Sequence, residues 1–218
     1  MTRTLGPMEK LAIWGAGGHA KVVADIVRRE GRFTLLGFLD DQNPERQGER
    51  FDDSLVIGGA DQLEALLNDD AMILFGFGDG RMRLMLAARI LMMGFRSPSA
   101  VHPSAVIAGS CSIGEGTVIA AGSVINPYAK LGRHVIINTG ATVDHDCIIG
   151  DGASVAPGVH LAGKVSVGKA TTLGIGTVAR ENIAIGSDCV IGAGSVVVSD
   201  IPDGVLAYGS PAKVIRML

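Results

Sequence analysis

An aliphatic residue recurs at every sixth position between Val101 and Val197, with no insertion or deletion. Only Ala179 interrupts this series of Val, Ile and Leu, and a small or β-branched residue stands two positions before most of its members. A period of six fits neither the 3.6-residue period of an α-helix nor the simple alternation of a strand. It is typical of a parallel β-helix, in which short strands and turns coil around a narrow aliphatic core. We therefore predict a β-helix over this stretch.

The composition of the 218 residues agrees with a narrow coil and argues against several classes of function. Glycine is abundant, with 31 residues, and only 4% of the residues are aromatic, as expected where rings have no room. The formal net charge of -3 and the lack of a basic run argue against binding to nucleic acid or to an anionic membrane. No apolar stretch reaches membrane-spanning length and no signal peptide precedes Met8, so we predict a cytoplasmic protein with an unstructured leader at Met1–Pro7.

The chain before the repeat has the pattern of a nucleotide-binding fold. A buried strand is predicted over Lys10–Trp14, followed by the glycine loop Gly15–Ala20 and a helix that ends near Glu30. Such a loop at a helix start presents backbone N–H groups and the positive end of the helix dipole to an anion. The loop matches the pattern G-x-G-x-x-(G/A), and Asp40 and Asp41 close the next strand about twenty residues on, as in a dinucleotide fingerprint.

This α/β segment is too short for a complete dinucleotide domain. Its remaining predicted elements are strands at 55–57 and 72–77 and helices at 61–67 and 81–93. The segment ends near Pro98, before the second half that a dinucleotide domain requires, which argues against a nicotinamide-dependent enzyme. We therefore predict a small α/β Rossmann-like half domain over 8–98, a β-helix over 99–200 and a closing segment over 201–218.

Four motifs carry a resemblance to a known family. They are the glycine loop Gly15-Ala16-Gly17-Gly18-His19, the strand end Phe38-Leu39-Asp40-Asp41, the turn Asp144-His145-Asp146-Cys147 and the closing Gly209-Ser210-Pro211-Ala212-Lys213. With the order of a truncated nucleotide fold before a hexapeptide helix, they resemble the bacterial nucleotide-sugar 4-amino N-acetyltransferases of the PglD type and the related sialic acid O-acetyltransferases. The likeness covers nearly the whole chain.

The resemblance implies a left-handed parallel β-helix in which three hexapeptides form one triangular coil and residues eighteen apart stack. It also implies a homotrimer with acetyl-CoA, the cosubstrate, bound between adjacent helices. Cys111, Cys147 and Cys189 share one small, inward position of the repeat. Cys111 and Cys147 would then lie two coils apart, about 10 Å by the strand spacing, which is beyond the reach of a disulfide. We predict that the cysteines fill the core.

The family holds the nucleotide of its sugar substrate in the N-terminal domain. The implied contacts are Gly17, Gly18 and His19 of the glycine loop, the pair Asp40 and Asp41, and Gly78 and Arg81 of the loop after the last strand of the domain. The two Asp side chains would accept hydrogen bonds from the base or ribose. Two alternatives stay open: the Asp pair could only cap a strand end, and His19 could be a surface residue at a helix start.

The predicted chemistry lies at Asp144-His145-Asp146. Counting from Val143 places His145 on the outside of the coil, and free imidazole, with a pKa of about 6.5, can take a proton at neutral pH. The resemblance makes His145 the general base and Asp146 its partner. A base suits the reaction because an ammonium group must lose a proton before it attacks an acetyl thioester.

Positions stacked near this motif complete the predicted acetyl-CoA site. Gly163 lies one coil beyond His145, about 4.8 Å away by the strand spacing, and its N–H could stabilise a tetrahedral oxyanion. The family positions for the cofactor are Asn138, Ser154, Gly163, Ile175 and Ala193. Ser154 stands where some members carry a second His near the acetyl group, so fine substrate specificity does not carry over.

Two rival interpretations concern the same fold. Zinc carbonic anhydrases also use it, but His134, His145 and His160 are separated by eleven and fifteen residues, so no two of them stack as a zinc site would need. We predict no metal, and we predict that His102, His134 and His160 are surface or inter-subunit residues. A non-catalytic scaffold or sugar-nucleotide-binding protein would not need a base flanked by acids beside a stacked glycine.

The sequence thus predicts an acetyltransferase. Acetyl would pass from acetyl-CoA to the 4-amino group of a UDP- or GDP-linked amino sugar, for surface glycan synthesis. The alternative within the class is O-acetylation of sialic acid or a related sugar.

Overall fold

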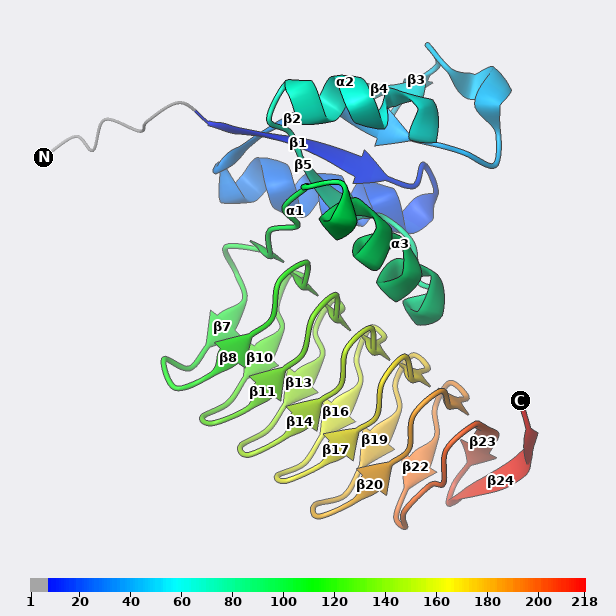
Figure 1. Cartoon of the computed structure of the whole chain (residues 1–218). Helices are drawn as coiled ribbons and strands as arrows, with labels where there is room; N and C mark the ends of the chain where they lie inside the picture. The colour runs from blue at the N-terminus through cyan, green and yellow to red at the C-terminus, as the bar shows by residue number, and fades with distance from the viewer. Residues whose placement is uncertain (1–7) are drawn as a thin grey trace, which may run out of the picture.

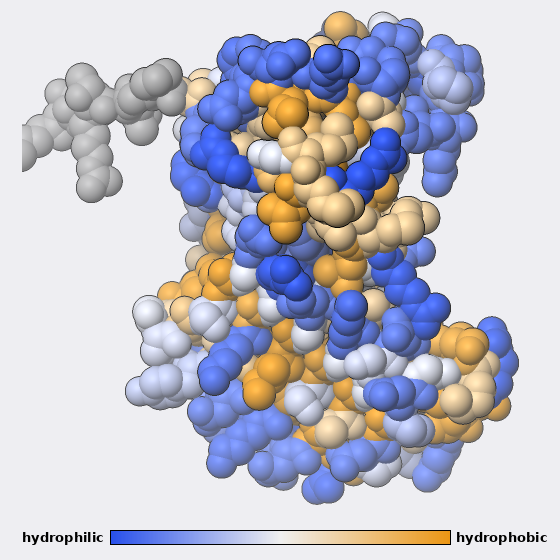
Figure 2. Space-filling model, viewed as in Figure 1, coloured by the Kyte–Doolittle hydropathy of each residue, from blue (hydrophilic) through white to orange (hydrophobic). Residues whose placement is uncertain are grey.

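The computed structural model describes residues 8–218, so the predicted leader at Met1–Pro7 lies outside the described residues. An N-terminal α/β domain is followed by a β-helix whose coils run on beneath it (Figure 1). On the face drawn in Figure 2 the molecule narrows between these two lobes, and apolar side chains reach the surface of the upper lobe. No helix of the described chain is long and apolar enough to cross a membrane.

The N-terminal sheet has five strands in the order β3-β4-β2-β1-β5. The strands are β1 (Glu9–Trp14), β2 (Phe33–Leu39), β3 (Arg50–Phe51), β4 (Ser54–Gly58) and β5 (Met72–Phe75). All neighbours are parallel except the hairpin of β3 and β4. Because β5 is buried along its whole length and β1 along its last four residues, both read as continuous apolar runs, as central parallel strands do.

Three α-helices cover the two faces of this sheet. They are α1 (Gly18–Glu30), α2 (Leu63–Asn68) and α3 (Gly80–Met92), with the short 3₁₀ turns η1 (Pro44–Arg46) and η2 (Ala60–Gln62) between strands. α1 packs on one face of the sheet, between it and the first strands of the β-helix, whereas α2 and α3 both pack on the other face. Gly31 ends α1 in the left-handed conformation, with φ 71°, the usual way for glycine to end a helix.

The predicted elements are confirmed with three differences. The strand predicted over 72–77 ends at Phe75, because the carbonyls of Phe77 and Gly78 accept hydrogen bonds from Arg83 of α3 and Ser154 of the β-helix. The helix predicted over 61–67 divides into η2 and α2. The two-residue strand β3 was not predicted, since so short an edge strand leaves no periodic pattern.

The β-helix is built from seventeen two-residue strands that coincide with the six-residue repeat. They are β6 (Ala100–Val101), β7 (Val106–Ile107), β8 (Ser112–Ile113), β9 (Val118–Ile119), β10 (Val124–Ile125), β11 (Lys130–Leu131), β12 (Ile136–Ile137), β13 (Thr142–Val143), β14 (Ile148–Ile149), β15 (Ser154–Val155), β16 (His160–Leu161), β17 (Ser166–Val167), β18 (Thr172–Leu173), β19 (Val178–Ala179), β20 (Ala184–Ile185), β21 (Val190–Ile191) and β22 (Val196–Val197).

These strands form the three faces of a left-handed parallel β-helix, as predicted. We call the faces the β6, β7 and β8 sheets after their first strands. Every pairing between two of these seventeen strands joins residues eighteen apart, for example Val143 with Leu161. The second residue of each strand points inward and is buried from Ile119 onward, including the small Ala179. Cys147 and Cys189 are buried, Cys111 is partly so, and all three thiols are free.

Three rows of turns join these sheets, and we name them by order. The first corner leads from the β6 sheet to the β7 sheet, the second from the β7 sheet to the β8 sheet, and the third from the β8 sheet back to the β6 sheet. After β22 the repeat ends, and the antiparallel strands β23 (Val205–Gly209) and β24 (Ala212–Met217) extend the β6 sheet. This hairpin closes the open end of the coil.

The third corner carries the N-terminal domain. Arg83 of α3 is only 2% exposed and donates hydrogen bonds to the carbonyls of His134 and Gly152 on that corner. His134 is itself only 4% exposed, and its ring centroid lies 5.6 Å from that of Phe75. The prediction that His134 is a surface or inter-subunit residue is therefore wrong. The sequence repeat could not reveal this burial, because it depends on where another domain docks.

Burial of His134 makes the fold sensitive to acid. Desolvation and the nearby charge of Arg83 lower the pKa of His134 to about 4, below the value near 6.5 expected in the unfolded chain. The folded state therefore resists protonation, and stability present above pH 6.5 is lost as the pH falls toward 4, by up to about 1.4 kcal/mol per pH unit.

We expect the urea midpoint to fall between pH 7 and pH 5, and to fall less in His134→Asn. Asn tolerates the left-handed backbone of this position, where φ is 53°. Equal pH dependence in the two proteins would contradict the prediction.

Candidate active site

A cavity of about 560 Å³ opens at the carboxyl ends of β1, β2 and β5. This edge of an open parallel sheet is where such folds bind ligands. Every lining residue belongs to the N-terminal domain: Trp14, Gly15, Ala16, Gly17, Gly18, His19, Leu39, Asp40, Asp41, Gln42, Asn43, Arg46, Gly76, Phe77, Gly78, Met82 and Leu86. The cavity thus brings together all the predicted nucleotide-binding residues except Arg81.

The glycine loop leaves the start of α1 open to a ligand. Gly17 is the N-cap residue and has no side chain to cap the helix, and the first turn holds no acidic residue. Its free N–H groups and the helix dipole favour an anion at this point. Beside them, the Nε2 atom of His19 is buried without a hydrogen-bond partner. Burial, and then the charge of Arg83, lower the pKa of His19 to about 4, so this ring is neutral at pH 7.

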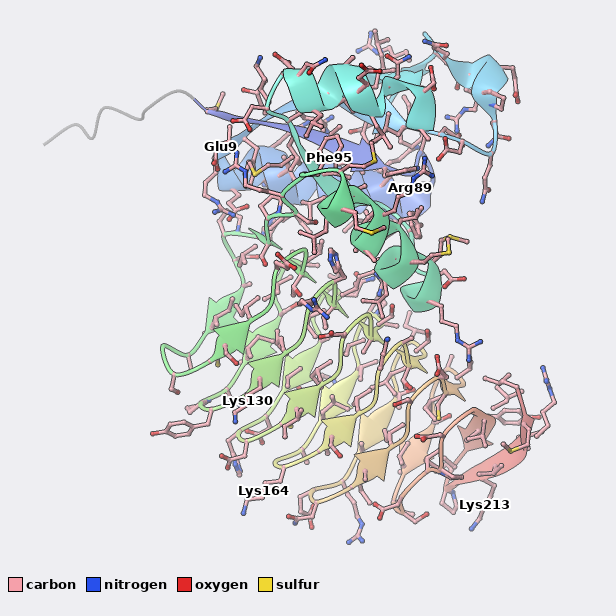
Figure 3. The ribbon with its side chains drawn as sticks, viewed as in Figure 1. Glu9, Arg89, Phe95, Lys130, Lys164 and Lys213 are labelled. Carbon is pink, nitrogen blue, oxygen red and sulfur yellow. The ribbon has the colours of Figure 1, made fainter. Side chains whose placement is uncertain are left out.

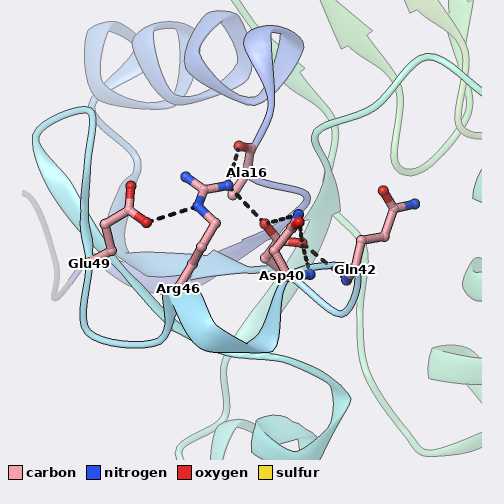
Figure 4. Close-up of polar contacts among 6 residues, drawn as sticks. Ala16, Asp40, Gln42, Arg46 and Glu49 are labelled. Atoms are coloured by element: carbon pink, nitrogen blue, oxygen red, sulfur yellow. Dashed lines mark hydrogen bonds and ion pairs between the residues drawn. The ribbon is translucent and has the colours of Figure 1, made fainter.

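Asp40 organises the loop that follows β2 (Figure 4). Its Oδ1 accepts the backbone N–H groups of Gln42 and Asn43, at 3.1 and 3.2 Å, and the Asn43 side-chain amide is shared between the two carboxylate oxygens. Its Oδ2 also accepts a 2.8 Å hydrogen bond from Arg46 Nη1. Two carboxylate oxygens offer about four acceptor positions, so these contacts occupy Asp40 fully.

Asp41 is exposed and retains acceptor positions beside the cavity. Its Oδ2 accepts from Trp14 Nε1 at 2.7 Å, and its Oδ1 accepts the backbone N–H of Ala60 at 2.6 Å. Each oxygen therefore keeps one of its two acceptor positions. Of the predicted pair, Asp41 is the side chain placed to accept a hydrogen bond from a ligand.

Arg46 lines the cavity and was missed by the sequence analysis. Its Nη1 donates to the Ala16 carbonyl in the glycine loop at 3.1 Å, and its Nε donates to Glu49 at 3.0 Å (Figure 4). Arg46 therefore holds the loop after β2 against the glycine loop. Its partners Asp40 and Glu49 are near in sequence, but its contact with the glycine loop joins residues thirty apart, which no local motif records.

Gly78 and Arg81, the two nucleotide-binding residues predicted in the loop after β5, lie in different places. Gly78 lines the cavity. Arg81 lies outside it, with Nε 2.7 Å from Oδ1 of Asp188 in the β-helix. The turn of α3 between them directs Arg81 toward the β-helix, while Met82 reaches the cavity instead.

His145 is exposed on the second corner and is held from both sides. Its Nδ1 lies 2.8 Å from Oδ2 of Asp146, and its backbone N–H donates to Oδ1 of Asp144 at 2.7 Å. Asn126 also donates to Asp144, at 2.9 Å, so two hydrogen bonds hold the pKa of this carboxyl below its usual range. Asp146 takes the left-handed conformation, with φ 60°, which Asp tolerates better than most residues.

Gly163 lies directly under the His145 ring. A Cβ atom at this position would stand 2.5 Å from His145 Nε2 and 2.6 Å from Cε1, so only glycine leaves the ring where it is. Neither the Gly163 N–H nor the Nε2 atom makes a hydrogen bond with any described residue. With Nδ1–H donated to Asp146, the Nε2 lone pair is available to accept a proton.

The remaining predicted cofactor residues lie on other corners. Asn138, Ile175 and Ala193 follow β12, β18 and β21 on the first corner, where Ile175 and Ala193 are exposed. Ser154 lies beside the third corner and is only 8% exposed, beneath α3. Its hydroxyl accepts from Arg83 and donates to the Gly78 carbonyl.

A single chain therefore keeps three parts of the predicted site apart. The cavity rests on the third corner, His145 and Gly163 are on the second, and the predicted cofactor residues Asn138, Ile175 and Ala193 are on the first. Lys164, whose N–H donates to the His145 carbonyl, is labelled in Figure 3 on the side of the coil away from the N-terminal domain. Among residues 8–218, no group of three or more His, Cys, Asp or Glu side chains is placed to hold a metal ion.

Comparison with known proteins identifies the family. The model of the PglD N-terminal domain matches residues 10–90, and that of the bacterial transferase hexapeptide matches residues 128–163. The structure of the acetyltransferase domain of PglB from Neisseria gonorrhoeae FA1090 is 38% identical, with a TM-score of 0.90, and the match covers 95% of this chain and 100% of that one. The chain belongs to the PglD family of hexapeptide-repeat acetyltransferases.

Two further relatives of this PglD-family chain carry names that specify a sugar. PerB from Caulobacter crescentus, in complex with CoA and GDP-perosamine, is 38% identical, with a TM-score of 0.88, over 98% of this chain and 100% of that one. UDP-N-acetylbacillosamine N-acetyltransferase from Bacillus subtilis (strain 168) is 36% identical over 114 residues. That match covers 52% of this chain and 52% of the relative, so it spans about half of each protein.

Proposed function

We propose that this protein transfers acetyl from acetyl-CoA to the 4-amino group of a nucleotide-linked amino sugar. The observation that carries the proposal is the His145 imidazole, paired with Asp146 through Nδ1 and exposed over Gly163 with Nε2 free. A base of this kind is what deprotonation of an amine nucleophile requires. Relatives whose names or bound ligands include 4-amino sugars linked to UDP or GDP support the acceptor class.

The proposed reaction has two chemical steps. The amine nitrogen of the sugar attacks the thioester carbonyl, forming the C–N bond, while His145 Nε2 accepts the proton that the nitrogen loses. Asp146 stabilises the imidazolium that results, and the Gly163 N–H donates to the oxyanion of the tetrahedral intermediate. The C–S bond then breaks, and the imidazolium returns its proton to the departing thiolate of CoA.

The substrate would enter through the N-terminal cavity. Its diphosphate would lie on the glycine loop at the start of α1, where the N–H groups of the helix are uncapped. Asp41, with free acceptor positions, would accept from the ribose or base. The uncharged ring of His19, whose Nε2 has no hydrogen-bond partner, lies beside the proposed diphosphate position. We also propose that the reaction takes place in the cytoplasm, the location predicted from the sequence.

The assembly we propose is a homotrimer with each site shared between two chains. The cavity, the base and the cofactor residues Asn138, Ile175 and Ala193 lie at three different corners of one β-helix, so a second copy is needed to bring them together. In a closed ring of three chains, the second corner of one chain can face the first and third corners of its neighbour. This arrangement would place acetyl-CoA between adjacent helices.

Release of free thiol from acetyl-CoA tests the proposed activity. We expect release with UDP- or GDP-linked 4-amino-4,6-dideoxy sugars, and none with free or CMP-linked sialic acid. Release only with the sialic acids would move the protein to O-acetylation. No release with any acceptor would contradict an acetyltransferase and favour the scaffold interpretation.

A further inference from the structure

The β-helix supports the wall of the nucleotide cavity from outside, because Ser154 donates a hydrogen bond to the carbonyl of Gly78, which lines the cavity. We propose that Arg83 and Ser154 orient two peptide groups so that the N–H groups of Gly78 and Asp79 bind acceptor oxygens at the sugar end of the substrate. The inference rests on the proposed function, because it assigns part of the nucleotide-sugar site. It makes Arg83 and Ser154 positioning residues and the two backbone N–H groups the ligand contacts.

Arg83 is a buried cation that contacts no carboxylate of residues 8–218. Its guanidinium donates to four backbone carbonyls and to one hydroxyl, those of His134, Phe77, Gly152, Ala153 and Ser154. Desolvation lowers the pKa of Arg83 to about 10, which still leaves it charged at neutral pH. A buried charge is costly unless its donors are satisfied, so this network fixes the position of every group that accepts from it.

Two carbonyls held in this network, those of Phe77 and Gly78, belong to the peptide groups beside the cavity. Arg83 Nη1 donates to the Phe77 carbonyl at 3.0 Å, and Ser154 Oγ donates to the Gly78 carbonyl at 3.1 Å. Ser154 is in turn held by Arg83 Nη2 at 3.0 Å. Both carbonyls therefore point out of the cavity and into the interface between the domains.

Because peptide groups are planar, fixing the direction of these two carbonyls also fixes the direction of the N–H groups in the same peptide units. In a trans peptide the C=O and the following N–H point in opposite directions. When the carbonyls of Phe77 and Gly78 point toward the interface, the N–H groups of Gly78 and Asp79 point toward the cavity. Neither N–H donates to any described residue, and both residues are exposed. The Asp79 side chain is occupied as the N-cap of α3, accepting from the Met82 N–H at 2.9 Å.

The order of the strands assigns these donors to the sugar end. The sheet places β2, β1 and β5 side by side. Asp41 follows β2, the glycine loop follows β1 and Gly78 follows β5. A nucleotide sugar whose base or ribose lies at Asp41 and whose diphosphate lies at the glycine loop extends its sugar toward Gly78. The geometry points to sugar hydroxyl oxygens, rather than the nucleoside diphosphate, as the partners of the two N–H groups.

The test compares Ser154→Ala with Ser166→Ala. Ser166 occupies the same position of the repeat in β17, and its hydroxyl makes no hydrogen bond with the described residues. Without the Ser154 hydroxyl the Gly78 peptide is free to rotate. We expect the KM for the nucleotide sugar to rise about tenfold in Ser154→Ala, the loss associated with one hydrogen bond, with the KM for acetyl-CoA unchanged and Ser166→Ala like wild type.

Affinity for the free nucleoside diphosphate separates the outcomes. Calorimetry with UDP and GDP should give Ser154→Ala a Kd within twofold of wild type. A Kd raised as much as the KM would assign the N–H groups to the diphosphate and overturn the sugar assignment, and an unchanged KM would overturn the proposal itself. Ser154→Cys, with a weaker donor, should fall between Ser and Ala. Absence of acetyl transfer in the wild-type protein would instead contradict the proposed function.

Discussion

His145→Ala is expected to lower kcat for acetyl transfer by about two to four orders of magnitude, the usual contribution of a general base. The amine would still bind, but its proton would have no acceptor, because Nε2 is the one atom of the turn that faces Gly163 with a free lone pair. The side chain is exposed and buries no core surface. The midpoint of thermal unfolding should therefore stay close to that of wild type.

A matched histidine separates loss of the base from loss of any surface imidazole. His160 is also exposed on the coil, with Nδ1 2.9 Å from Thr142 Oγ1, and has no carboxylate partner. His160→Ala should keep near-wild-type turnover. Asp146→Asn should show a smaller loss than His145→Ala, since the base remains but its imidazolium is less stabilised. Near-normal turnover in His145→Ala would remove the assigned base.

His145→Ala, combined with a second variant in the cavity, also tests whether the active site is shared between two chains. Gly17→Glu adds a carboxylate at the anion site, and its Cβ meets no other atom within 4 Å. Both variants should be inactive alone. When the two variants are co-expressed, a site works if its cavity comes from a His145→Ala chain and its base from a neighbouring Gly17→Glu chain. If chains mix at random in a closed ring, each condition holds for half of the sites, so about a quarter of the sites should be active. No recovery in mixed assemblies would place the cavity and base within one chain.

The β-helix could be predicted because its determinants are local in sequence. One inward position recurs every six residues, and the structure buries it from Ile119 onward. The turn that carries His145 follows from the same count. The resemblance supplied the three-hexapeptide coil, and with it the stacking of residues eighteen apart that predicted Gly163 beside His145.

The interface between the domains could not be predicted in this way. His134 and Ser154 occupy positions that the repeat leaves outward, yet α3 covers both. Arg81 and Arg83 are two residues apart, and the turn of the helix sends one to Asp188 and the other into the interface. Arg46 reaches the cavity only because the loop after β2 returns to the glycine loop. Each case depends on how separate segments meet, which no periodicity records.

Gly163→Ala is expected to reduce kcat about a hundredfold while hardly changing stability. The new methyl group would overlap the His145 ring, where contacts below 3 Å require one partner to move. The ring is exposed and can swing away at little cost in folding free energy, about 0.5 kcal/mol or less. That movement takes Nε2 from the reacting position, and misplacement of a catalytic group by about 1 Å can cost a hundredfold in rate.

Gly109→Ala is the matched control for this substitution. Gly109 lies on the same second corner, 54 residues or three coils before Gly163 (163 − 109 = 54), and a Cβ there meets no atom within 4 Å. Neither glycine has a positive φ, so neither change strains the backbone. Gly109→Ala should keep full activity, and both proteins should melt close to wild type. If kcat of Gly163→Ala stayed within twofold of wild type, the space between Gly163 and the imidazole could not be where the acetyl group reacts.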